Sequence, residues 1–194
     1  MHHSRSRDTN HFRPGLPEPT WVESMGGPLI VLPETALSLW HGCTEASLVL
    51  GVPGEADDYD RACEAAEDPA AIVPVGKEGA LALVLGDEPA MTCYLPEHRA
   101  FVRWLGADSD AHLLAAAEQV LDDPDTIWEE CGVWETSGPA VLMDSAVAGA
   151  DLTTPDPDLP QQALVAIAAG RWEVRAAHAR GDIASVGVVR LVAL

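Results

Sequence analysis

The stretch WVESMGGPLIVL at residues 21–32 sets the pattern for the chain. Its apolar run at 29–32 is short and continuous, with Gly-Gly-Pro before it and a proline after it, which predicts a buried β-strand. A second stretch, WETSGPAVLM at 134–143, repeats the order of Trp, Ser, Gly-Pro and apolar run, with two residues fewer between the serine and the glycine. The two stretches therefore look like two copies of one motif.

The repeated motif predicts an internal duplication with pseudo-repeats at 20–107 and 126–194. A chance match in a Gly- and Ala-rich chain is the alternative. The segment between the repeats, DSDAHLLAAAEQVLDD, begins with capping residues, carries leucines and alanines on one face and ends before Pro124. We expect one main helix there, at about 109–122.

Short apolar or alternating runs separated by Gly- and Pro-containing turns fill the remainder. They lie at 71–75, 80–85, 91–95 and 98–105, of which the first three resemble a meander, and at 126–135, 140–143 and three places after residue 162. The predicted fold class is α+β, a β-rich single domain over 20–194 with two antiparallel sheet units. Residues 1–19 are polar, carry three prolines and predict a flexible N-terminal arm.

The charge is strongly acidic, with 31 Asp and Glu against 11 Lys and Arg and a formal net charge of −20. Such a charge repels nucleic acid and anionic lipid and speeds encounter with basic proteins, so we expect neither nucleic acid nor membrane as a partner. Solubility alone is the alternative explanation. No apolar leader and no membrane span are visible, which favours a cytoplasmic protein.

Catalytic and metal-binding motifs are missing from the sequence. It contains no GxSxG, no P-loop, no GxGxxG after a strand and no HExxH. Four cysteines, at 43, 63, 93 and 131, form no CxxC pair and no short Cys/His cluster, which indicates reduced, mostly buried thiols. We therefore expect no catalytic residues, no metal and no cofactor, and a protein that is not an enzyme.

Tryptophans beside acidic residues are the candidate binding residues. Six tryptophans are present; core packing is the ordinary role of each, but tryptophan is also a common interface anchor. One group lies near an acidic, turn-rich loop at 51–69 that we expect to hold one helical turn, and the other follows the main helix. The predicted interface residues are Trp40, Glu55, Asp57, Asp58 and Asp60 in the first group, and Trp128, Glu129 and Glu130 in the second.

The order of several motifs resembles one protein family. WVESMGGPLIVLPETALSLWHGC, DYDRAC, GALALVLGDEPAMTCYLPEHRAFVRW, WEECGVWETSGPAVLMDSAVAGADL and GRWEVRAAH together are similar to the immunity protein 21 family of polymorphic toxin systems. The resemblance covers about residues 20–192 and implies a protein that binds and neutralises a cognate toxin. A basic toxin such as a nuclease would suit the charge. A small ligand-binding or enzymatic domain, with a pocket between the two β units, is the alternative.

Overall fold

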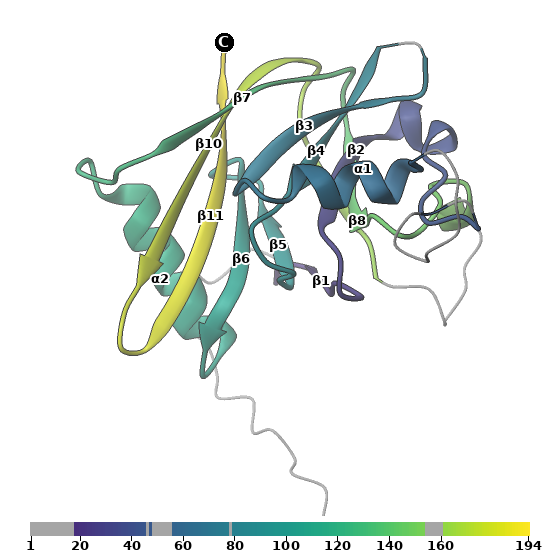
Figure 1. The fold of residues 1–194 in the computed structure, drawn as a ribbon. Coiled ribbons are helices and arrows are strands. Elements are labelled where there is room, and N and C mark those ends of the chain that lie inside the picture. Colours follow the sequence, from purple (N-terminus) through teal and green to yellow (C-terminus); the bar gives the residue numbers. More distant parts are fainter. Residues whose placement is uncertain (1–17, 46, 48–55, 78, 154–160) are drawn as a thin grey trace, which may run out of the picture.

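The structure is a computed structural model that describes residues 18–45, 47, 56–77, 79–153 and 161–194. Two antiparallel sheets pack face to face; a single α-helix covers the outer face of the larger sheet, and the other helices lie against the smaller one (Figure 1). The α+β fold with two antiparallel sheets, predicted from the sequence, is confirmed.

The larger sheet has six strands in the order β1 (Trp21–Val22), β5 (Thr92–Leu95), β6 (Ala100–Ala107), β11 (Ala184–Ala193), β10 (Gly170–Arg180) and β7 (Glu129–Thr136). The smaller sheet has five, in the order β3 (Ala70–Val75), β4 (Ala80–Leu85), β2 (Leu29–Pro33), β8 (Ala140–Asp144) and β9 (Ala163–Val165). The helices are η1 (Glu34–Leu39), α1 (Asp58–Ala65), α2 (Asp110–Asp122) and η2 (Asp151–Thr153).

Three apolar layers hold these elements together, and side-chain alternation along the strands explains them. In β2, Val31 faces the core between the sheets, whereas Ile30 faces the layer beneath α1 and η1. In β6, Phe101 lies between the sheets and Val102 packs toward α2. The central strands, such as β2, β5 and β8, are therefore buried on both faces, which accounts for their nearly continuous apolar runs, whereas most of β7 is exposed.

The main helix and most strands lie where the sequence predicts them. The helix expected at about 109–122 is α2, and Ser109 caps it by accepting a hydrogen bond from the backbone N–H of His112. The meander expected over 71–95 is wrong, because β3 and β4 pair in the smaller sheet and β5 belongs to the larger one. The chain changes sheets at Asp87, whose φ is 75°. A sequence pattern marks strands and turns but does not state which sheet receives the next strand.

The two halves of the chain contribute equivalent strands to both sheets. In the larger sheet β1, β5 and β6 correspond to β7, β10 and β11 about a central β6–β11 pair. In the smaller sheet β4 and β2 correspond to β9 and β8 about a central β2–β8 pair, with β3 as an additional edge strand. The strand order thus has twofold symmetry, and each half of the chain supplies one contiguous half of each sheet instead of a sheet of its own. Duplication stays a prediction, and most of the 1–19 arm lies outside the described residues.

Candidate protein interface

The acidic residues at the start of α1 accept hydrogen bonds from backbone N–H groups. Asp57 caps α1 by accepting a hydrogen bond from the Asp60 N–H at 2.9 Å, and Asp60 accepts one from the Asp57 N–H at 3.1 Å. Asp57 also accepts from the backbone N–H and the hydroxyl of Thr44. A reciprocal capping box of this kind satisfies amide groups that a helix start leaves unpaired. These carboxylates therefore join α1 to the segment before it.

The remaining residues of the first predicted group are also occupied inside the fold. Asp58 accepts from the backbone N–H of His41 at 2.6 Å and forms an ion pair with Arg61. The hydroxyl of Ser47 donates to Asp60 at 2.9 Å. Trp40 is fully buried, and its indole N–H donates to the Ser145 carbonyl at 2.9 Å. The interface prediction for these residues conflicts with their burial, and Glu55 lies outside the described residues.

The second predicted group lies at the junction of α2 and β7. Pro124 cannot continue the helix, and Asp123 before it adopts an extended conformation. The turn that follows is fixed by hydrogen bonds from Asp125 N–H to the Asp123 carboxylate and from the Thr126 hydroxyl to the Val120 carbonyl, at 2.9 and 2.7 Å. This turn sets the direction in which the chain enters β7.

That direction buries one aromatic side chain and exposes an aliphatic one. Trp128 is partly buried against the apolar layer under α2, whereas Ile127, its neighbour, is 92% exposed. Around Ile127 in sequence lie exposed carboxylates from the helix end, the turn and the start of β7. We call this set the Ile127 surface: Asp122, Asp123, Asp125, Ile127, Glu129 and Glu130.

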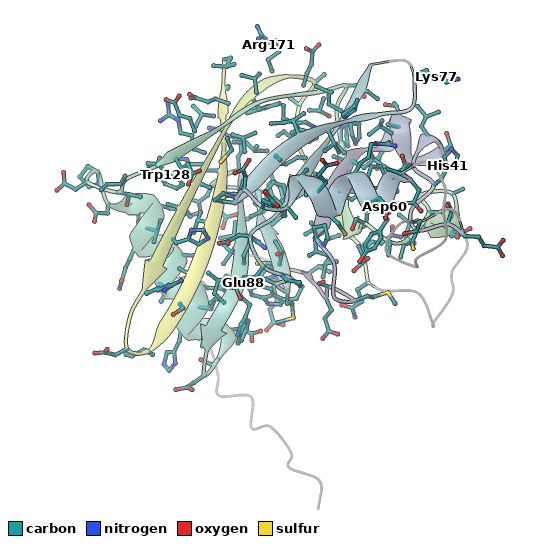
Figure 2. The ribbon with its side chains drawn as sticks, viewed as in Figure 1. His41, Asp60, Lys77, Glu88, Trp128 and Arg171 are labelled. Atoms are coloured by element: carbon teal, nitrogen blue, oxygen red, sulfur yellow. The ribbon has the colours of Figure 1, made fainter. Side chains whose placement is uncertain are left out.

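The Ile127 surface lies far from α1. Figure 2 shows Trp128 at one end of the molecule and Asp60 at the other, so the two predicted groups do not form one patch. Glu129 and Glu130 of the second group are exposed, whereas in the first group Asp57 is partly exposed and Asp58 and Asp60 are buried. The sequence prediction included Trp128, Glu129 and Glu130 from this part of the chain but did not include Ile127. The signal for Ile127 was an isolated isoleucine that lies between a proline-containing turn and β7 and is followed directly by the partly buried Trp128.

Basic residues do not balance the acids of this region. Between Arg103 and Arg171 the sequence contains thirteen Asp and Glu residues and no Lys or Arg. On the neighbouring strand, Arg175 stands opposite Glu130 in the register, but its guanidinium pairs with Glu173 at 2.7 Å. Burial, and then the Glu129 charge, raise the pKa of the nearby Cys131 thiol. An exposed apolar side chain within unneutralised carboxylates suits contact with a basic protein surface.

A metal site, paired cysteines or a membrane-spanning helix would point to a different function. Within the described ranges, no group of three or more His, Cys, Asp or Glu side chains is placed to hold a metal ion. All four cysteines are free thiols; Cys93 is buried and the other three are half-buried, so burial is less complete than predicted. Among the described helices, none has the length and apolar character needed to cross a membrane.

Comparison with known families matches most of the chain. Residues 20–184 match the family model described as Immunity protein 21. No curated protein and no solved structure matches the chain. The matched range contains both sheets up to the first residue of β11, both α-helices and the Ile127 surface.

Proposed function

The chain belongs to the immunity protein 21 family, and from this premise we propose that it neutralises a cognate toxin by stoichiometric contact, without catalysis of its own. Family membership implies an immunity protein and a toxin partner. The proposal adds that the toxin is basic, as many nucleases are, and that the complex forms in the cytoplasm.

The observation that carries the proposal is the Ile127 surface. A 92% exposed isoleucine loses water-accessible apolar area on docking, and five carboxylates around it attract a basic partner. Electrostatic attraction of this kind raises the association rate, while the apolar contact slows dissociation. The neighbouring Trp128 packs against the apolar layer under α2 and so holds this part of the chain to the core. The described residues offer no comparable arrangement for chemistry.

Co-expression with the toxin-like domain encoded beside the gene tests the function. We expect survival of the host cells and a co-purified complex of one immunity protein and one toxin domain. Cell death together with no complex would overturn the proposal. This measurement concerns the whole chain and does not depend on which surface docks.

Association kinetics then test the surface. Glu129→Gln with Glu130→Gln removes two charges from the Ile127 surface, whereas Glu64→Gln with Glu67→Gln removes two exposed charges at α1. Because both double variants change the net charge equally, any difference between them is local. We expect the first to lower the association rate constant several-fold at low salt and the second to have a much smaller effect, with both differences shrinking at high salt. Equal effects would place the interface elsewhere.

A further inference from the structure

A small recess opens on the first half of the chain, away from the Ile127 surface. It has a volume of about 130 Å³ and lies between the β1–β2 loop, α1 and the β4–β5 loop. Its lining includes Gly27, Pro28, Tyr59, Asp87, Glu88 and Pro89. Figure 2 shows Glu88 well separated from Trp128. The alternative hypothesis from the sequence placed a pocket between the two β units. This recess, in contrast, is formed by residues of the first half alone.

Two glycines allow the walls to approach as closely as they do. A Cβ atom on Gly27 would lie 2.6 Å from the Tyr59 ring, and one on Gly86 would lie 2.2 Å from the Asp68 carbonyl oxygen. Any larger residue would displace the tyrosine or the β4–β5 loop. At about 130 Å³ the recess is smaller than the several hundred Å³ typical of metabolite sites and matches a single side chain.

The rim of the recess is acidic. Asp87 pairs with His178 at 3.3 Å, and the backbone carbonyl of Glu88 accepts a hydrogen bond from Arg103, which fixes the β4–β5 loop. Glu88 is exposed, and its negative charge, together with that of Asp87, acts on Arg103. Arg103 itself is 1% exposed and lies inside the protein.

A further carboxylate lies close to the recess. Asp144 is 1% exposed, and its oxygens accept the backbone N–H groups of Met25 and Ala146 at 2.7 and 2.9 Å. Its charge acts on Tyr59, whose pKa is raised to about 12, first by burial, so the phenol stays neutral. The recess thus combines an uncharged aromatic wall with an accessible carboxylate, and Met25 near its mouth is 68% exposed.

We propose that this recess accepts one arginine side chain of the toxin, as a second anchor in addition to the more distant Ile127 surface. The assignment of the partner rests on the proposed function. A guanidinium is planar, packs on aromatic and proline surfaces and pairs with a carboxylate, here Glu88. An anchor of this kind, seated in a pocket, contributes more to complex lifetime than rim charges do.

The recess can be tested without the toxin. The whole chain, labelled with ¹⁵N, is titrated with N-acetyl-arginine methylamide, with its citrulline analogue and with its lysine analogue. We expect saturable shifts of the Gly26, Gly27 and Gly86 amide signals with the arginine compound, and at least five-fold weaker binding of the other two. No saturation at these amides, or equal binding of citrulline or lysine, would overturn the assignment.

A matched pair of variants identifies the carboxylate. Glu88→Gln should weaken binding of the arginine compound at least five-fold, whereas Glu67→Gln, an exposed residue that does not line the recess, should leave it unchanged. An unchanged dissociation constant in Glu88→Gln would overturn the role of Glu88. Failure of the arginine compound to bind, with an intact toxin complex, refutes the recess alone. Binding of the compound without any toxin complex refutes the proposed function and retains the recess.

Discussion

Val31 of β2 pairs directly with Leu142 of β8, and each is the third residue of the apolar run in its copy of the repeated motif. The neighbouring pairs are reciprocal, because the second residue of one run stands opposite the fourth residue of the other. Both side chains are fully buried in the core between the sheets. The centre of the smaller sheet is therefore a contact between equivalent positions of the two halves.

Shortening Leu142 should destabilise the whole fold. Leu142→Ala leaves a cavity in the central core, and we expect the free energy of unfolding to fall by roughly 2–5 kcal/mol. Urea denaturation measures the change. Leu164→Ala, on the adjacent β9 where the side chain is 64% exposed, is the control and should stay within about 0.5 kcal/mol of the parent. Similar losses in both variants would contradict the central position of Leu142.

Removing the exposed isoleucine should affect binding but not folding. Ile127→Ser should leave the free energy of unfolding within about 0.5 kcal/mol and speed dissociation of the toxin complex several-fold. Ile183→Ser is a matched control, because Ile183 is 61% exposed and lies in the turn between β10 and β11. Surface plasmon resonance measures both dissociation rates. Faster dissociation in Ile183→Ser alone would move the apolar contact to that turn.

Removing the carboxylate that caps α1 should affect folding but not binding. Asp57→Ala deletes the acceptor for the Asp60 and Thr44 N–H groups, and we expect a loss of about 1 kcal/mol in stability. The association rate with the toxin should change no more than in a variant that removes one exposed carboxylate of α1, such as Glu64→Gln. A large kinetic effect with unchanged stability would show that Asp57 contacts the partner after all.

Alkaline pH should destabilise the protein partly through Tyr94. Its side chain is 5% exposed, and its hydroxyl has no hydrogen-bond partner among the described residues. Burial raises the pKa of Tyr94 from 10.0 to about 12. Between these two pKa values the unfolded chain loses the phenolic proton, whereas the folded chain keeps it. The contribution of the neutral Tyr94 to stability is therefore complete below pH 10 and is lost as the pH rises through about 12.

Tyr94→Phe isolates this contribution. Burial lowers the pKa of Arg103 to about 10, which acts in the opposite direction, but Arg103 is the same in both proteins and cancels in the comparison. We expect the variant to lose less stability than the parent between pH 10 and 12, and to be equal or about 1 kcal/mol more stable at neutral pH, since no buried hydroxyl is left unpaired. Urea denaturation between neutral pH and pH 12 measures the free energy of unfolding of both proteins. If the two free energies fell in parallel with rising pH, the role of Tyr94 would be refuted.

Local patterns made most elements predictable. Ser109 and Pro124 bracket α2 because caps and prolines act within a few residues, and the run at 29–32 is a strand because it is short and bounded by turn residues. The partner of each strand was not predictable in this way. Nothing in the sequence of β5 distinguishes pairing with β4 from pairing with β1 and β6, which depends on contacts across the whole fold.

The accessibility of the candidate interface residues was predictable only in part. Trp40 and Trp128 both stand near acids in the sequence, but Trp40 is fully buried and Trp128 is only partly buried. Charge density alone did not separate carboxylates that cap a helix, such as Asp57, from those that face solvent, such as Glu129. The difference lies in the backbone N–H groups that Asp57 binds, one at Asp60 in the helix that it caps and one at Thr44, 13 residues earlier.

The place of β11 has a consequence for biosynthesis. Residues 184–193 lie in the middle of the larger sheet, between β6 and β10. Until they have emerged from the ribosome, β6 lacks a neighbour on one side and the first half cannot complete either sheet. Domains generally fold as units during synthesis, but here that unit needs strands from both ends of the described chain. A truncated nascent chain would thus expose unpaired strand edges, which makes it a substrate for chaperones and proteases.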